Sequence, residues 1–190
     1  MENPYVKLAK EAVEKFIKEK RIIEPPDWLP EEFFKEKAGT FVTIEKEGQL
    51  RGCIGTYLPT KENIAKEIIA NAISAATEDY RFGPIVKEEL PHLVFTVYIL
   101  SKPELVKDIK ELNPKKFGII VKTVPHTYPN GTDVVFNGHI PHKTGLLLPD
   151  LEGIDTPEKQ ILAACQKGGI NLLEEKIVIY RFKVKKYKNH

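Results

Sequence analysis

The stretch LRGCIGT, residues 50–56, is the most informative part of this chain. Its period-2 alternation, if it forms a strand, places Arg51, Cys53 and Gly55 on one face of a sheet and Gly52 on the other. Glycine weakens a strand, so two glycines indicate a bulge or the close approach of a helix, a ligand or another backbone. We therefore expect Cys53 on a central strand with a helix packed close to it.

The residues around Cys53 allow two interpretations. Arg51 lies on the same predicted face, and a positive charge beside a thiol favours the reactive thiolate form. His92 could orient or deprotonate that thiol, as a cysteine nucleophile requires. Alternatively, the glycines only admit a packed helix, and Cys53 is a small buried hydrophobic residue, which is the usual behaviour of free cysteine.

Composition indicates an ordinary water-soluble domain. The chain has 190 residues and a net charge of +2, too small to indicate nucleic-acid binding by itself. No apolar run approaches the length of a membrane span and no signal peptide is visible, so we expect a cytoplasmic protein. Cys53 and Cys165 belong to no C-x-x-C pair, which argues against a zinc ribbon or a disulfide framework. Abundant lysine and glutamate with scarce glutamine and methionine predict a thermophilic source.

Hydrophobic periodicity and turn residues predict an α/β chain of the α+β type. Hairpin signals outnumber strand-helix-strand units, so we expect a mainly antiparallel sheet flanked by helices, with room for a smaller second lobe in a single domain spanning residues 1–190. The predicted helices cover residues 4–21, 61–78 and 156–167, and the predicted strands cover residues 41–44, 50–56, 93–100, 117–124 and 177–185.

Four further motifs follow LRGCIGT along the chain. They are EDYRF at 78–82, ELPHL at 89–93, GLLLPD at 145–150, and Gln160 with Lys167 and Gly168. In this order they resemble the AMMECR family, named after an X-linked contiguous-gene deletion syndrome, over nearly the whole chain. The resemblance implies an α/β fold and a site around the LRGCIGT strand, without naming a reaction.

The predicted site combines the LRGCIGT strand with the end of the second helix. A carboxylate is electrostatically unfavourable at a helix C-terminus, so Glu78 and Asp79 there suggest a further role. They could accept a proton while Arg81 binds an anionic group, or all three could form an ion-pair network that ties a loop to the sheet. The candidate catalytic residues are Cys53, Glu78, Asp79 and His92, and the candidate substrate-binding residues are Arg51, Gly52, Gly55, Thr56 and Arg81.

Two other clusters carry weaker signals. His126, His139 and His142 with Asp133 are residue types that bind metals, but their spacing matches no zinc motif, so we expect no metal and no cofactor. The tail, residues 183–188, contains four lysines around a tyrosine. It could contact phosphates, although a solvated lysine-rich end is the commoner meaning of such a run.

Two function hypotheses remain. The first is an enzyme or enzyme subunit that holds a small anionic substrate in a cleft around the LRGCIGT strand, with Cys53 as nucleophile or thiol ligand. The AMMECR resemblance implies partners here, because in bacteria and archaea the family is often fused to, or encoded beside, Memo-type and radical-SAM proteins. The second is a non-catalytic module that binds a protein or nucleic acid, in keeping with the transcription, repair or translation roles suggested for the family.

Overall fold

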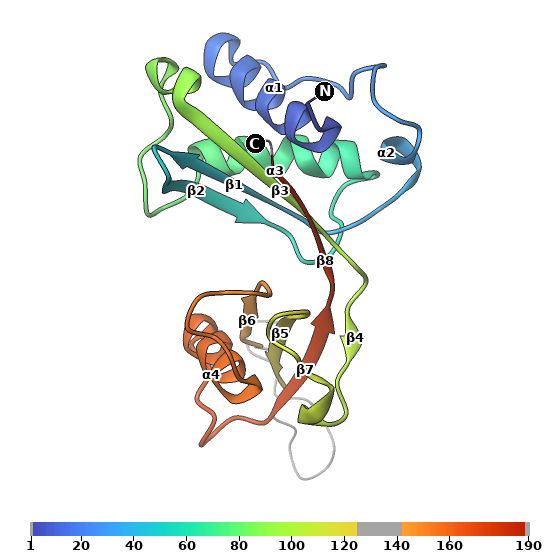
Figure 1. Cartoon of the computed structure of the whole chain (residues 1–190), viewed down its shortest axis with the longest axis vertical. Coiled ribbons are helices and arrows are strands. Elements are labelled where there is room, and N and C mark those ends of the chain that lie inside the picture. The colour runs from blue at the N-terminus through green and yellow to red at the C-terminus, as the bar shows by residue number, and fades with distance from the viewer. Residues whose placement is uncertain (1, 125–141, 189–190) are drawn as a thin grey trace, which may run out of the picture. The chain divides into compact units, whose positions relative to one another are not determined.

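The computed structural model describes residues 2–124 and 142–188, and the chain divides into two compact units (Figure 1). The first comprises the residues up to 102 together with the last strand from residue 185, and the second comprises residues 103–184. The predicted α/β class is confirmed. The chain forms two four-stranded antiparallel sheets, however, where the sequence suggested one.

The first unit is a four-stranded sheet with helices on one face. The strand order is β2-β1-β3-β8, α3 packs on β1 and β2, and α1 packs on β3 and on α3 (Figure 1). The elements of this unit are α1 (Pro4–Glu19), α2 (Glu32–Lys35), β1 (Thr40–Lys46), β2 (Gln49–Gly55), α3 (Ile64–Thr77), the 3₁₀ helix η1 (Lys87–His92), β3 (Leu93–Leu100) and β8 (Val184–Lys188).

Capping residues set the ends of both long helices in this unit. The Asn3 side chain accepts a hydrogen bond from the backbone N–H of Tyr5, and Lys20 ends α1 in the left-handed conformation. The predicted helix near the N-terminus is therefore confirmed. Helix α3 begins later than predicted because Asn63 caps it through the backbone N–H of Lys66.

The LRGCIGT stretch forms β2, and the hairpin with β1 is confirmed. The prediction of a central strand is wrong, because β2 lies at the edge of its sheet. The expected close helix is present: a Cβ added to Gly52 would overlap the carbonyl oxygen of Ala75 in α3. The glycine therefore serves helix packing, and the exposed edge of β2 needs a partner other than a strand.

Alternation along the strands separates the two faces of this sheet. Val42 and Ile44 of β1 and Val97 of β3 are completely buried on the side that α1 and α3 cover. Thr43 lies on the other face of the sheet, where it pairs with Cys53 of β2. The thiol therefore belongs to the face of the sheet that these helices do not cover.

The second unit is a smaller sheet in the order β4-β7-β5-β6, with α4 packed on β5 and β6. Its elements are β4 (Glu104–Leu105), the 3₁₀ helix η2 (Ile109–Glu111), β5 (Gly118–Thr123), β6 (Thr144–Leu147), α4 (Pro157–Gly168) and β7 (Ile177–Phe182). The core contains Ile119, Val121, Ala164 and Cys165. Here too a glycine lies under a helix, because a Cβ on Gly145 would overlap the carbonyl oxygen of Ala164.

The predicted last strand, residues 177–185, is wrong as a single element. It is two strands, β7 and β8, which belong to different sheets and are separated at Lys183. The two predicted Asn-Gly turns, at 130–131 and 137–138, lie outside the described residues. Within residues 2–124 and 142–188, no helix is long and apolar enough to cross a membrane.

Candidate functional site

Cys53 lies half-buried on β2 with polar neighbours on β1 and β3. The hydroxyl of Thr43 donates a hydrogen bond to Cys53 Sγ at 3.2 Å. Burial raises the pKa of the nearby Tyr98 phenol, and the negative charge of a Cys53 thiolate acts in the same direction. The sulfur, a hydroxyl and a phenol therefore lie near one another on the face of the sheet opposite the helices.

Asp79 caps the exposed edge of β2 beside this thiol. Its Oδ2 accepts the backbone N–H of Cys53 at 2.8 Å, and its two oxygens accept Arg81 Nε at 2.9 Å and Nη2 at 2.7 Å. The Arg81 guanidinium is the main reason that the pKa of Asp79 falls to about 2. Since the charged carboxylate is fully engaged, it acts near neutral pH as an anchor rather than as a proton acceptor.

Arg81 is the cation that this anchor places near the thiol. Its side chain is 43% exposed, and its Nη1 has no hydrogen-bond partner among the described residues. Asp79 raises the pKa of Arg81, and the charge of a Cys53 thiolate adds to that effect. Arg81 and Cys53 are thus electrostatic neighbours, and the outer side of the guanidinium is available to an anion.

Arg51 is bound elsewhere, although it shares a face with Cys53 in the strand pattern. It forms a two-bond ion pair with Glu89, at 3.0 Å from Nε and 2.9 Å from Nη2, and it also donates to the carbonyl oxygen of Gly83 at 2.9 Å. This pairing with Arg51 is the main reason that the pKa of Glu89 falls to about 2. Arg51 therefore ties the loop after α3 to the sheet.

The structure does not bring Glu78 or His92 to the thiol. Glu78 follows the end of α3 and lines a pocket on that helix together with Ile22 and Ser74. His92 directly precedes β3 at the position where Leu93 pairs with Lys46. That pair lies three residues along β1 from the Thr43–Cys53 pair, or about 10 Å at 3.4 Å per residue.

Comparison with known proteins places this architecture in a family. The family model described as AMMECR1 matches residues 6–187. The chain belongs to the AMMECR1 family. A Thermotoga maritima protein is 49% identical over 98% of both chains, and Clostridium acetobutylicum protein CA_C1420 is 41% identical over 98% of this chain but only 36% of its own length. The crystal structure of the uncharacterized protein PH0010 from Pyrococcus horikoshii has a TM-score of 0.81 at 29% identity, covering 98% of this chain and 90% of that one.

These AMMECR1-family relatives include proteins of thermophiles, in line with the lysine-rich and glutamate-rich composition. The names of these relatives give no reaction, substrate or partner. The function proposed for this AMMECR1 domain therefore rests on its own residues.

The remaining predicted site residues in this AMMECR1 domain pack against its own elements. A Cβ on Gly55 would overlap the Phe41 ring, so this glycine leaves room for the neighbouring strand. Thr56 donates from its hydroxyl to Glu67 Oε1 at 2.6 Å. Gly55 and Thr56 thus continue β2 into a second polar network, which is formed with α3.

The sequence patterns did not predict this second polar network. Glu67 is 1% exposed, and it accepts hydrogen bonds from the backbone N–H groups of Thr60 and Lys61, both at 2.7 Å. Asn71, four residues later on α3, donates to Thr40 Oγ1 at 2.8 Å. Two polar residues at i and i+4 within an apolar helix face were the available signal. The network fixes the loop after β2 onto α3.

The histidine cluster lies mostly outside the described residues. His126, Asp133 and His139 fall within 125–141, and His142 is exposed. Among residues 2–124 and 142–188, no group of three or more His, Cys, Asp or Glu side chains could hold a metal ion. The expectation of no metal stays a prediction.

The lysine-rich tail of the AMMECR1 domain is part of the first sheet. Tyr187 stacks on Tyr5 of α1 with ring centroids 4.1 Å apart, and Lys188 forms an ion pair with Glu45 at 2.5 Å. Lys186 lies 5.8 Å from the centre of the Tyr98 ring. These contacts give the tail a structural role and draw its aromatic ring into the packing against α1.

Proposed function

We propose that Cys53 is the reacting group of an enzyme or enzyme subunit whose small substrate carries an anionic group, and that Arg81 binds this group. One observation carries the proposal: a single carboxylate, Asp79, holds both the backbone N–H of Cys53 and the guanidinium of Arg81. A half-buried thiol and an arginine with an unused donor are thereby fixed to the same anchor. Structural packing alone does not require Arg81 to keep that donor exposed.

The chemistry proposed for this site is attack by the sulfur of Cys53. The thiolate forms a bond to an electrophilic carbon of the substrate, and the leaving group departs with the electrons of its bond to that carbon. The thiol proton goes to solvent, because Asp79, with a pKa of about 2, is a poor acceptor. Thr43 donates to the sulfur at 3.2 Å and so orients it.

A role beside a second protein is part of this proposal. The chain covers only 36% of the Clostridium acetobutylicum relative, so in that protein the domain is joined to further sequence. Such an arrangement supports a shared pathway, for which the family resemblance suggests Memo-type or radical-SAM partners. The alternative, a module that binds nucleic acid through the tail, has less support because Tyr187 and Lys188 are engaged within the first unit.

Two alkylating reagents of nearly equal size test the site. In each, the Cys53 sulfur bonds to the methylene carbon and iodide leaves, but iodoacetate is an anion and iodoacetamide is neutral. The positive charge of Arg81 should favour reaction with the iodoacetate anion. Two opposite unit charges 4 Å apart in water attract each other by about 1 kcal/mol, which corresponds to a rate increase of about fivefold. The measured quantity is the iodoacetate-to-iodoacetamide rate ratio at Cys53, with Cys53→Ser used to subtract Cys165.

Replacing Arg81 alone would leave the buried Asp79 carboxylate without its ion-pair partner, so both variants also replace Asp79. Asp79→Asn retains the Arg81 charge, and the double variant Asp79→Asn/Arg81→Gln removes it. We expect the rate ratio to fall about fivefold between these two variants. Arg21→Gln, at an exposed position just after α1, should leave the ratio unchanged. An equal ratio in both Asp79 variants would refute anion binding by Arg81, and an unreactive Cys53 would refute the thiol mechanism.

A further inference from the structure

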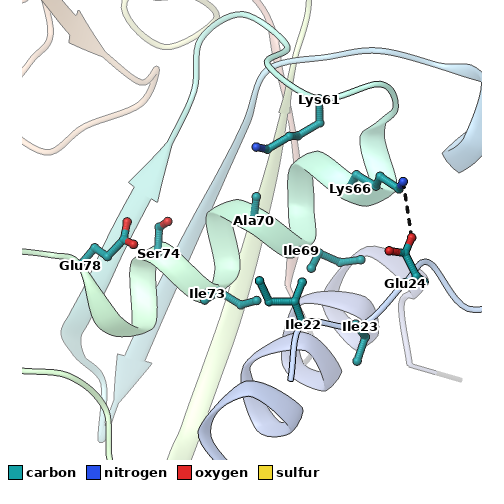
Figure 2. Close-up of a pocket in the computed structure, with 10 residues that line it drawn as sticks. All are labelled: Ile22, Ile23, Glu24, Lys61, Lys66, Ile69, Ala70, Ile73, Ser74 and Glu78. Atoms are coloured by element: carbon teal, nitrogen blue, oxygen red, sulfur yellow. Dashed lines mark ion pairs between the residues drawn. The ribbon is translucent and has the colours of Figure 1, made fainter. Parts of the chain in front are cut away.

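A separate pocket of about 320 Å³ lies between α3 and the segment that follows α1 (Figure 2). All of its lining residues belong to the first unit, and none of them belongs to the Cys53 site. Its apolar wall includes Ile69 and Ile73 of α3 and Ile22, whose side chain is 66% exposed. An exposed isoleucine facing a concave apolar wall is suited to an apolar ligand.

The pocket carries one unpaired charge of each sign. Lys66 is already engaged with Glu24 and Glu62. Lys61 and Glu78, by contrast, form no ion pair or side-chain hydrogen bond with any other described residue. Figure 2 shows Glu78 beside Ser74 at one end of the pocket, and Lys61 above Ala70.

The position of Glu78 strengthens the case for a bound cation. It caps the C-terminus of α3, where the helix dipole is negative, and the last turn of α3 contains no basic residue. A carboxylate added to that end increases the negative potential. A ligand ammonium group would relieve it, while the Lys61 ammonium would attract a ligand anion.

The backbone beside the pocket is also unpaired. Among the described residues, the main-chain groups of Ile22, Ile23 and Glu24 form no hydrogen bond. Pro25 follows directly, and a residue that precedes proline is driven toward an extended conformation. Such a segment can pair with an extended peptide in the manner of an added strand.

We propose that this pocket binds a short apolar peptide with free termini, in an extended conformation, with its amino group at Glu78 and its carboxylate at Lys61. From Ala70 to Glu78, α3 rises about 12 Å at 1.5 Å per residue. A tripeptide spans about 10 Å at 3.3 Å per residue and can reach both charges. A single amino acid carries its two charges too close together to do so.

The test uses the tripeptide alanyl-leucyl-alanine and its N-acetylated and C-amidated forms, with binding to the full chain followed by amide chemical shifts. Blocking either terminus should weaken binding about fivefold. In Glu78→Gln, acetylation should lose its effect while amidation keeps it, and in Lys61→Gln the reverse should hold. Glu88→Gln and Lys10→Gln, exposed positions outside the pocket, are the matched controls.

Two further probes make the outcome decisive. Ala70→Leu places a larger side chain in the pocket lining below Lys61 and should abolish binding. The probe 8-aminooctanoate, which has the same end charges but no peptide groups, should bind more weakly than the tripeptide. Absence of saturable binding at about 10 mM tripeptide, or equal binding of the free and doubly blocked peptides, would overturn the proposal. Equal binding of 8-aminooctanoate would overturn the peptide assignment.

Discussion

The two units of this protein use the same packing device but place their cysteines differently. In each unit a strand glycine lies under the carbonyl oxygen of a helix alanine, Gly52 under Ala75 and Gly145 under Ala164. Cys53 lies half-buried on the sheet face that α1 and α3 do not cover, whereas Cys165 is 1% exposed in an apolar core that raises its pKa. The glycines thus serve close packing in both units, and only one unit combines that packing with an accessible thiol.

The largest expected effect concerns this shared device. Gly52→Ala and Gly145→Ala should each lower the free energy of unfolding by about 3 kcal/mol or more, because the new methyl group overlaps helix backbone, which cannot rotate away. Gly83→Ala is the matched control: its added Cβ meets nothing within 4 Å, so the change should stay within about 0.5 kcal/mol. Denaturant unfolding measures all three.

Regional hydrogen exchange separates the effects of the two glycines on the two units. Each unit has its own buried core, so Gly52→Ala should speed amide exchange in β1 and β3 more than in β5 and β7, and Gly145→Ala should do the opposite. If either alanine variant is as stable as Gly83→Ala, helix and strand do not approach closely at that glycine.

A smaller effect concerns the ion pairs that distinguish the first unit. The pKa falls from 3.8 to about 2 for Asp79 and from 4.5 to about 2 for Glu89, and both side chains are at most 12% exposed. At 1.36 kcal/mol per pH unit, they contribute about 2 and about 3 kcal/mol to stability. Because the folded pKa values are lowered, this stability is present above about pH 4.5 and is lost as the pH falls toward 2.

Acid unfolding of single variants checks this assignment. Asp79→Asn and Glu89→Gln should be less stable than the wild type at neutral pH, and they should lose less stability between about pH 4.5 and pH 2. Glu88→Gln, an exposed neighbour, should follow the wild-type curve. If Asp79→Asn loses as much stability as the wild type when the pH is lowered, this carboxylate does not hold the loop.

The local elements of the fold could be predicted, because capping and periodicity are local. Asn3, Pro4 and the apolar period of the N-terminal segment specify α1, and Glu47-Gly48 specifies the hairpin between β1 and β2. The division of residues 177–188 between two sheets could not be predicted. Alternation continues across Lys183, and a period of two does not say which sheet a strand joins.

The site could be predicted only in part, because strand alternation shows which face of the sheet a side chain occupies but not which side chain it pairs with. Alternation correctly separates Cys53 from Gly52, and the helix end correctly places Asp79 and Arg81 near β2. The pairing of Arg51 with Glu89, and the direction taken by Glu78, depend on the path of the loop after α3. Side-chain partners separated by 38 residues, as in the Arg51–Glu89 bond, leave no local signal.

Labelling of the two thiols in the folded protein distinguishes a functional Cys53 from a cysteine that only packs. Native protein should be labelled with iodoacetamide across a denaturant series below the unfolding transition, and each cysteine should be quantified by peptide mass spectrometry. We predict that Cys53 reacts at a rate independent of denaturant, whereas Cys165 reacts only through unfolding, since one is half-buried and the other is 1% exposed in a core. A Cys53 that reacts only when the protein unfolds, as Cys165 does, would contradict a functional thiol on the sheet face.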